Sequence, residues 1–288
     1  MMSHDAPVLV LDGPPGAGKT SLLARMLPVL GDECLWFTEP NARLSTGLRA
    51  PVHPSPAGHT LWFLRHELEK ARAMKSLAVD PATRLLISDR NHLGALAYCY
   101  ATRAADSLPY RTAVDFYARR IAPALPERVL TAILLVGPDE SLARRGNVAE
   151  RPRWQQWFDE GLLERLHHFY TDIAPTLCPT PPRIINTDGA TRDAVLAQVA
   201  ALLADAGLDE AAKRLTAAAP ARRPELDAQF AAVYDALGGL ESFGHPFTEP
   251  IAHRGGTVQL CQLGALHRDP SGHTGLWDLL AEPVRGAA

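Results

Sequence analysis

One eight-residue segment constrains the fold of this chain more than any other part of its sequence. It matches the pattern G-x-x-x-x-G-K-[S/T] at every fixed position and reads Gly13-Pro14-Pro15-Gly16-Ala17-Gly18-Lys19-Thr20. The apolar run Pro7–Asp12 precedes it and is typical of a strand buried on both faces. The residues Lys19–Leu30 follow with the pattern of a helix that ends at Gly31. A strand, a glycine-rich turn and a helix in this order predict a phosphate-binding loop.

The chemistry of a triphosphate explains the residue types in this loop. Glycines let backbone N–H groups turn toward phosphate oxygens, and the start of the helix adds a partial positive charge. We expect Lys19 to reach the β- and γ-phosphates and Thr20 to ligate magnesium. The expected ligands are therefore ATP and Mg²⁺, with the nucleotide bound by Gly13 through Thr20 and by Ser21.

Strand patterns alternate with helix patterns as far as about residue 205. Further strands are expected at Cys34–Thr38, Arg84–Ser88, Val129–Val136 and Arg183–Asn186. Helices are expected at Thr60–Leu77, Leu93–Arg103, Tyr110–Ile121 and Arg192–Leu203, and a long helical region with a break near Gly161 at Pro152–Leu177. This alternation predicts an α/β fold of the P-loop NTPase type, a three-layer sandwich around a parallel sheet of about five strands.

The amino-acid composition and the pattern of expected elements change after residue 206. We expect residues 1–206 to form the domain that carries the phosphate loop, and residues 207–288 to form an accessory region whose purpose the sequence does not indicate. Leu208–Leu240 is rich in alanine and mostly helical in pattern, and Thr257–Leu263 has the pattern of a strand. The accessory region is thus expected to be mostly helical.

Charged residues follow the second and third expected strands at the point where each ends. Ligands of parallel sheets bind beyond the carboxyl ends of the strands, so these residues are candidates for the active site. Glu39 follows the second strand and could accept a proton from a hydroxyl or hold a sugar. Asp89 ends the third strand as a magnesium-holding acid does, and Arg90 after it could bind a phosphate through two hydrogen bonds.

The order of these motifs resembles that of thymidylate kinases and the related deoxynucleoside kinases over roughly residues 7–205. The most specific match is Asp89-Arg90 followed in register by Leu96-Ala97-Tyr98. The helix with Leu61-Trp62-Phe63-Leu64-Arg65 resembles the one that carries a base-contacting arginine in that family. Arginines of the segment that resembles the family's lid follow downstream: Arg144, Arg145, Arg151 and Arg153.

The resemblance implies an enzyme that transfers the γ-phosphoryl group of ATP to a nucleoside monophosphate similar to dTMP. It implies that Lys19, Asp89 and one of the four downstream arginines act on the transferred group, and that Glu39, Arg65, Arg90 and Tyr98 contact the acceptor. The metal ligands would be Thr20 and Asp89. The resemblance also suggests a homodimer.

Because the sequence departs from the family pattern at several positions, acceptors other than a nucleoside monophosphate stay possible interpretations. Asn91 replaces an aromatic residue and Cys99 stands where a base-reading glutamine is expected. No arginine precedes Glu39-Pro40, which is closer to deoxynucleoside kinases that use this glutamate as the base for a 5′-hydroxyl. A kinase of a non-nucleotide small molecule is a further alternative. A regulatory P-loop ATPase with a partner-binding tail is the alternative of another class.

Composition excludes some partners. The formal net charge is −3 and the pI is about 6.4, which argues against a surface built for nucleic acid. The four cysteines form no C-x-x-C pair, so neither a disulfide framework nor a zinc site is expected. The residues Met1–Pro7 lack a basic segment and the apolar run after them is short, so we expect no signal peptide and no membrane span. These features predict a cytoplasmic protein.

Overall fold

A computed structural model describes residues 5–40, 56–102, 108–146, 152–217 and 224–277 of the chain. Its centre is a five-stranded parallel sheet with the strand order β2-β3-β1-β4-β5. The strands are β1 (Val8–Asp12), β2 (Cys34–Phe37), β3 (Leu85–Asp89), β4 (Val129–Leu135) and β5 (Arg183–Asn186). All five were expected from the sequence, and their bounds differ from the expected ones by a residue or two at most.

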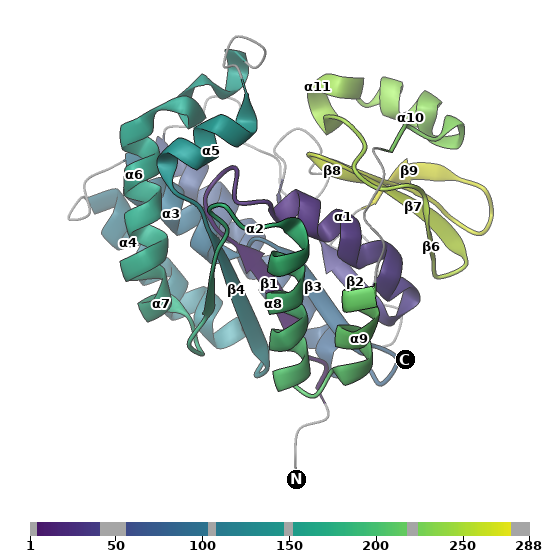
Figure 1. Cartoon of the computed structure of the whole chain (residues 1–288), viewed down its shortest axis with the longest axis horizontal. Coiled ribbons are helices and arrows are strands. Elements are labelled where there is room, and N and C mark those ends of the chain that lie inside the picture. The colour runs from purple at the N-terminus through teal and green to yellow at the C-terminus, as the bar shows by residue number, and fades with distance from the viewer. Residues whose placement is uncertain (1–4, 41–55, 103–107, 147–151, 218–223, 278–288) are drawn as a thin grey trace.

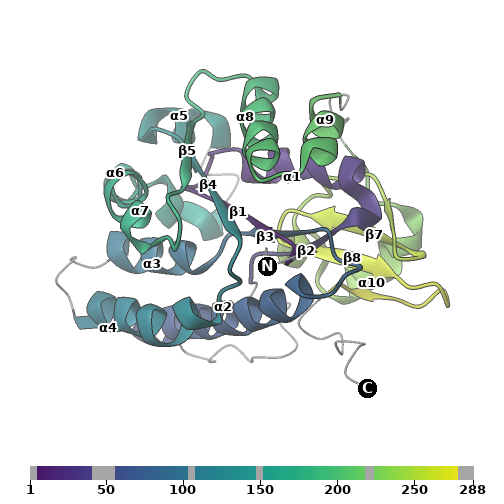
Figure 2. The same ribbon diagram turned by 90° about the horizontal axis from the view of Figure 1, so that it is seen from below.

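Helices cover both faces of this sheet and complete the three-layer sandwich. On one face lie α1 (Lys19–Leu30), α8 (Arg192–Asp205) and α9 (Asp209–Ala217). On the other lie α2 (Pro56–Ala78), α3 (His92–Thr102), α4 (Leu108–Phe116), α6 (Glu160–His168) and α7 (Ala174–Leu177). Figure 2 looks along the layers and shows α8 and α9 on the opposite side of the sheet from α2 and α4.

The central strands are apolar throughout because both of their faces are buried. Successive side chains of a strand point to opposite faces. Accordingly Val8 and Val10 pack into the hydrophobic cluster under α2 and α3, while Leu9 and Leu11 pack into the cluster under α1 and α8. These four side chains are at most 1% exposed. Burial on both faces fixes the position of the β1 carboxyl end, from which the phosphate loop begins.

The helical region expected over Pro152–Leu177 is broken near Gly161, as the sequence indicated, and once more after His168. A 3₁₀ segment, η5 (Pro152–Phe158), precedes α6, and a π-helical turn, η6 (Phe169–Ile173), separates α6 from α7. Asp159 causes the first break, because its side chain accepts a hydrogen bond from the Leu162 N–H at 2.6 Å and so caps α6. A further helix, α5 (Pro138–Arg145), follows β4 and was not predicted.

Short turns of helix complete this part of the chain. They are η1 (Gly31–Glu33), the π-helical η2 (Tyr117–Ile121) and η3 (Ala122–Ala124). None of the helices among the described residues combines the length and the apolar character needed to cross a membrane.

The C-terminal region contains the expected helices and, in addition, an antiparallel sheet of which only one strand was expected. Its helical elements after α9 are η7 (Ala228–Phe230), α10 (Ala231–Ala236) and α11 (Gly239–Phe243). The strands follow in chain order as β6 (Ile251–His253), β7 (Gly256–Cys261), β8 (Gly264–Arg268) and β9 (Thr274–Leu276). Figure 1 shows this sheet beside α1.

This second sheet shares a hydrophobic cluster with the domain that carries the phosphate loop. Val258 and Leu260 belong to the same cluster as Leu27 and Trp36. The ring of Trp36, in β2, also lies 4.6 Å from the ring of His253 and 5.7 Å from that of Trp277, measured between centroids. The boundary expected near residue 206 falls between α8 and α9, and the division into two domains stays a prediction.

Candidate active site

The phosphate loop connects β1 to α1 and lies against the end of β4. Gly13, Gly16 and Gly18 all have positive φ angles, of 138°, 78° and 93°. A Cβ atom at Gly13 would lie 2.0 Å from the carbonyl oxygen of Leu134, so no larger residue fits there. Ser141 of α5 holds the loop from the other side, because its Oγ donates a hydrogen bond to the Pro15 carbonyl at 2.7 Å. The loop therefore has the conformation that a phosphate cradle requires.

Lys19 is folded back into this loop. Its Nζ atom donates hydrogen bonds to the carbonyl oxygens of Gly13 at 2.8 Å and Pro14 at 2.9 Å, and the side chain is buried. Burial, together with the positive charge of Arg90, lowers the pKa of Lys19 to about 7. Thr20 and Ser21 are half-buried beside it at the start of α1. The ammonium is thus held at the loop by acceptors weaker than phosphate oxygens.

Asp12 is a candidate site residue that the sequence interpretation missed. It is the last residue of β1 and is completely buried. Its Oδ1 accepts hydrogen bonds from the Gly13 N–H at 2.7 Å and the Tyr170 hydroxyl at 2.7 Å, and its Oδ2 accepts one from the Asn91 N–H at 3.1 Å. The carboxylate therefore joins the phosphate loop to the residues after β3. The available signal was an acid as the last residue of an otherwise apolar strand.

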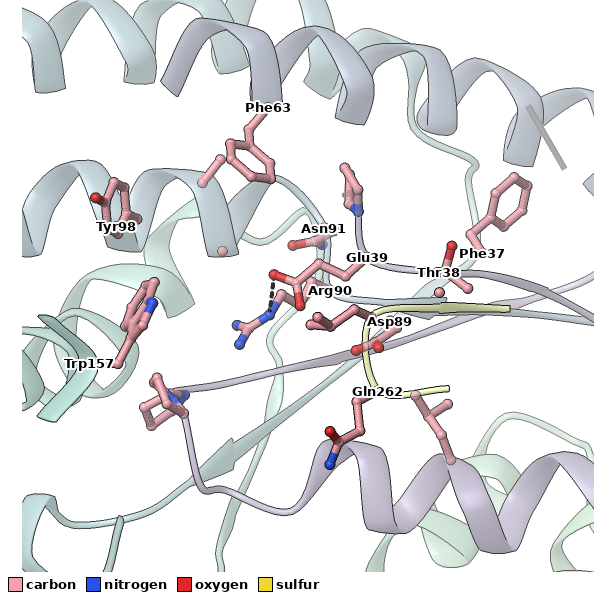
Figure 3. Close-up of a pocket in the computed structure, with 18 of the residues that line it drawn as sticks. Phe37, Thr38, Glu39, Phe63, Asp89, Arg90, Asn91, Tyr98, Trp157 and Gln262 are labelled. Atoms are coloured by element: carbon pink, nitrogen blue, oxygen red, sulfur yellow. Dashed lines mark ion pairs between the residues drawn. The ribbon is translucent and has the colours of Figure 1, made fainter. Parts of the chain in front are cut away.

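Arg90 lies where the phosphate loop and the ends of β2 and β3 meet. Its Nη1 donates a hydrogen bond to the Gly13 carbonyl at 2.9 Å and approaches Asp12 at 3.4 Å, and its Nε forms an ion pair with Glu39 at 2.9 Å (Figure 3). The Glu39 carboxylate is about half exposed, at 51%. Glu39 and the other acids raise the pKa of Arg90 against the effect of burial, so its charge is permanent.

The backbone of Arg90 is held in an unusual conformation. Its φ angle is 59°, in the left-handed region that residues other than glycine rarely adopt. The Arg90 carbonyl accepts hydrogen bonds from Ser88 Oγ at 2.5 Å and from Lys70 Nζ at 3.1 Å. Lys70 is itself paired with Glu67 at 3.0 Å, and both side chains are less than 5% exposed. These contacts from β3 and α2 offset the local strain and fix the direction of the guanidinium.

Asp89 stands at the end of β3, in register with Leu11 of β1. This pairing places the carboxylate next to the start of the phosphate loop. Burial and the neighbouring negative charge of Glu39 raise the pKa of Asp89 to about 6. Arg90, Lys19 and Lys70 act in the opposite direction. An acid at this position can hold a cation that would restore its ionised form.

One cavity of about 490 Å³ joins these groups. Its wall includes Pro14 and Pro15 of the phosphate loop, the charged side chains of Glu39, Asp89 and Arg90, and a set of aromatic rings. Figure 3 shows Phe63, Tyr98 and Trp157 on one side of the Glu39–Arg90 ion pair, and Asp89 and Gln262 on the other. The rings of Tyr98 and Trp157 lie 5.3 Å apart between centroids. A flat, partly polar molecule could bind between such rings with an anionic end at Arg90.

Comparisons with known proteins agree with this geometry. A family model described as an AAA domain matches residues 8–177, more than half of the chain. The chain belongs to this AAA domain family. No curated protein sequence matches it.

Among solved structures, thymidylate kinase from Candida albicans is similar to this member of the AAA domain family with a TM-score of 0.52. The two share 16% identity, over 71% of this chain and 93% of that one. A deoxyadenosine kinase from M. mycoides shares 18% identity over 69% of this chain and 98% of that one, with a TM-score of 0.49. At such identities the likeness concerns the fold, and the expected thymidylate-kinase-like fold is confirmed.

The structure separates the predicted arginines of this AAA domain protein. Arg145 lies over the Phe158 ring, 4.5 Å from its centroid, and lines the cavity. Arg144 does not line the cavity but reaches the phosphate loop: it donates hydrogen bonds to the Gly16 carbonyl at 3.3 Å, to Thr187 Oγ1 at 3.1 Å and to the Thr187 carbonyl. Arg151 lies outside the described residues, and the side chain of Arg153 in η5 is likewise not described.

Arg65 is the predicted acceptor contact that the structure does not bring to the site. Its side chain is exposed, whereas Phe63 and Glu67 of the same helix line the cavity. The helical period explains the difference, because positions 63 and 67 lie on one face of α2 and position 65 lies away from it. Tyr98, which is predicted to contact the acceptor, lines the cavity.

Proposed function

We propose that this protein is an ATP-dependent phosphotransferase whose acceptor is a nucleoside monophosphate similar to dTMP. The observation that carries the proposal is a single cavity whose wall includes Pro14 and Pro15 of the phosphate loop, a permanently charged arginine and several aromatic rings. Such a cavity can hold the two partners of a phosphoryl transfer in line, and positioning is most of what this reaction requires.

The residues present fit ATP and magnesium. Gly18 faces open space, since a Cβ there would meet no atom within 4 Å, and Lys19 Nζ now donates to two carbonyl oxygens that phosphate oxygens would replace. Thr20 and Asp89 supply the hard oxygen ligands that magnesium prefers. Bound there, the ion would neutralise charge on the β- and γ-phosphates. Arg145, at the cavity wall, is the proposed contact to the transferred group.

The acceptor phosphate is proposed to bind at Arg90. A phosphate would have to displace Glu39, whose carboxylate is half exposed and forms an ion pair of a kind that contributes about 0.2–1 kcal/mol. A dianionic phosphate that accepts two hydrogen bonds from a guanidinium is a stronger partner than one carboxylate oxygen. The base of the nucleotide would then lie between Phe63, Tyr98 and Trp157.

A second candidate acceptor is a hydroxyl group, as in a nucleoside. The ion pair between Glu39 and Arg90 favours it, because it orients a carboxylate toward the cavity beside the phosphate loop. A hydroxyl has to lose a proton during transfer and gains from such a base, whereas a phosphate is already anionic. Glu39 therefore has a different role in each candidate: a phosphate acceptor displaces it from Arg90, whereas a hydroxyl acceptor uses it as a base.

The first experiment incubates the protein with ATP, Mg²⁺ and a panel of nucleosides and nucleoside monophosphates, with product analysis by mass spectrometry. Phosphorylation of a monophosphate supports the leading proposal, and phosphorylation of a nucleoside supports the second candidate. A product formed only from another class of small molecule would make the protein a kinase of non-nucleotide acceptors. Slow ATP hydrolysis that no acceptor accelerates would favour a regulatory ATPase instead.

The substitution Glu39→Gln separates the two leading candidates. With a hydroxyl acceptor, loss of the base is expected to lower kcat by about 10²–10⁴-fold. With a monophosphate acceptor, kcat is expected to stay within tenfold and KM to stay level or fall, because Arg90 no longer has a competing partner. Glu69→Gln is the matched control, since Glu69 is on the exposed face of α2 and pairs with Arg72.

A further inference from the structure

Arg90 and Asp12 carry opposite charges in the buried part of the site, yet they do not form a close ion pair. Arg90 Nη1 lies 3.4 Å from Asp12 Oδ1, although the Asp12 side chain is completely buried. The same guanidinium approaches the Gly13 carbonyl and the Glu39 carboxylate more closely, each at 2.9 Å. Charge-assisted hydrogen bonds to a carboxylate are usually about 2.7–2.9 Å long. The guanidinium is therefore held away from the buried carboxylate and toward the exposed one.

Tyr170 explains this arrangement, because its hydroxyl takes the place that the guanidinium would otherwise fill. The hydroxyl donates a hydrogen bond to Asp12 Oδ1 at 2.7 Å, and the Gly13 N–H donates to the same oxygen at 2.7 Å. A carboxylate oxygen has two lone pairs, so two short hydrogen bonds fill its capacity as an acceptor. The oxygen that Arg90 approaches therefore has no lone pair left for a short bond to the guanidinium.

The position and the chemistry of Tyr170 suit this role. It belongs to η6, the π-helical turn between α6 and α7, and such turns are often found at functional sites. Its side chain is 1% exposed and lines the cavity. Burial and the neighbouring Asp12 carboxylate raise the pKa of Tyr170 well above its ordinary value. The hydroxyl therefore stays protonated, and stays a donor, at neutral pH.

We propose that Tyr170 is a positioning residue of the acceptor site. By donating to Asp12, its hydroxyl keeps the Arg90 guanidinium turned toward Glu39 and the cavity, where the phosphate of the acceptor would bind. Without the hydroxyl, Asp12 would attract the guanidinium into a short ion pair inside the protein. A phosphate would then have to compete with a buried carboxylate. The inference rests on the proposed function, in which Arg90 binds the acceptor, and it adds a residue to that site.

The substitution Tyr170→Phe removes the hydroxyl and keeps the ring in the cavity wall. The Kd of dTMP, measured by calorimetry, is expected to rise about tenfold, because a buried carboxylate then competes for Arg90 in a medium of low dielectric constant. The Kd of a non-hydrolysable ATP analogue with Mg²⁺ is expected to change little, since Asp12 still accepts from the Gly13 N–H. Equal rises in the two Kd values would indicate a general structural role and overturn the proposal.

Tyr117→Phe is the matched control for this experiment. Tyr117 is also buried, but its hydroxyl donates to the Leu177 carbonyl instead of to Asp12, and its side chain does not line the cavity. The control loses the same chemical group and is expected to bind dTMP as the wild type does. A rise in the Kd of dTMP as large as that of Tyr170→Phe would overturn the proposal.

A second substitution distinguishes positioning from a loss of packing. In Asp12→Asn/Tyr170→Phe the negative charge that would attract Arg90 is gone, so the Kd of dTMP is expected to return close to the wild-type value. A defect of packing would instead grow with a second buried substitution. In a folded double variant, a Kd no lower than that of Tyr170→Phe would therefore contradict the proposal.

The direction of Arg90 can also be followed without any acceptor. In protein with ¹⁵N-labelled arginine, the Arg90 Nε–H signal reports the ion pair with Glu39 and is assigned by its loss in Arg90→Lys. Tyr170→Phe is expected to move this signal toward the position that it takes in Glu39→Gln, whereas Tyr117→Phe is expected to leave it in place. An unmoved signal in Tyr170→Phe would overturn the proposal, whether or not the double variant folds.

The NMR measurement makes failure of the inference distinguishable from failure of the proposed function. If dTMP does not bind the wild type but the Arg90 signal moves in Tyr170→Phe, then Tyr170 positions Arg90 and the nucleotide acceptor is wrong. If dTMP binds the wild type and Tyr170→Phe equally well, the proposed function stands and the inference is wrong.

Discussion

At the scale of single residues, the candidate site is organised around Arg90. Its guanidinium reaches the phosphate loop and Glu39, while its carbonyl is held by Ser88 and Lys70. Gly13, Glu39 and Lys70 come from different segments, so the direction of the arginine depends on contacts that are far apart in the sequence. The buried ion pair with Glu67 holds Lys70 in place for its hydrogen bond to the Arg90 carbonyl, although Lys70 itself does not line the cavity.

Lys70→Met is expected to destabilise the protein strongly. Removing one partner of a buried ion pair leaves the other charge uncompensated, at a cost of about 3–5 kcal/mol in the free energy of unfolding. Chemical denaturation measures this change. Lys75→Met, an exposed position on the same helix, is the control and is expected to change stability by less than about 0.5 kcal/mol.

A double substitution tests the cause of that loss. In Glu67→Gln/Lys70→Met no unpaired charge stays buried, so the double variant is expected to be more stable than Lys70→Met alone. Additive losses from the two single variants, measured in the same way, would show that the two residues act independently.

At the scale of elements, the close contact between the phosphate loop and β4 determines which substitutions the loop can accept. Gly13→Ala is expected to reduce both stability and ATP binding, because its Cβ would lie 2.0 Å from the Leu134 carbonyl oxygen. Gly31 also has a positive φ, of 54°, but a Cβ there would meet no atom within 4 Å, so the cost of Gly31→Ala is limited to about 1–3 kcal/mol of backbone strain. Denaturation and calorimetric titration with ATP compare the two. An equal cost at both positions would contradict the close approach to β4.

The same elements show how far sequence reasoning reaches. The strands, α1 and the loop were predictable because apolar runs, glycines and Lys19 are contiguous in the sequence. Asp89, Arg90 and Glu39 were predictable because parallel strands end at one edge of the sheet. Two hydrogen bonds join distant segments, and no local sequence pattern indicates them: Tyr170 donates to Asp12, and Lys70 donates to the Arg90 carbonyl. Arg65 was predicted to contact the acceptor, but its side chain lies off the face of α2 that lines the cavity.

At the scale of the whole molecule, the C-terminal sheet is joined to the central domain by a cluster of aromatic rings. His253 lies among Trp36, Trp277 and His267 and is 1% exposed. Burial and the positive charge of Arg254 lower its pKa to about 4, although Asp32 acts in the opposite direction. The junction between the C-terminal sheet and the central domain therefore contains a histidine that must stay neutral.

This junction is expected to weaken in acid. The unfolded chain binds a proton at His253 below its ordinary pKa of about 6.5, whereas the folded chain does not until about pH 4. The contribution of His253 is thus complete above pH 6.5 and falls by up to about 1.4 kcal/mol per pH unit as the pH drops toward 4. Denaturation curves between pH 7 and 4.5 measure it. His253→Phe is expected to lose less stability over this range than the wild type, and an unchanged slope would contradict the assignment.

The central claim is that the phosphate loop and the cavity beside it transfer a phosphoryl group to a small molecule. The most direct measurement incubates γ-³²P-labelled ATP, Mg²⁺ and the acceptor panel with wild-type protein and with Lys19→Ala, and follows the label. We predict labelled nucleotide product with the wild type and a loss of at least about 10²-fold with Lys19→Ala, because the charge that meets the phosphates is gone. Release of the label only as inorganic phosphate, or undiminished transfer by Lys19→Ala, would contradict the account.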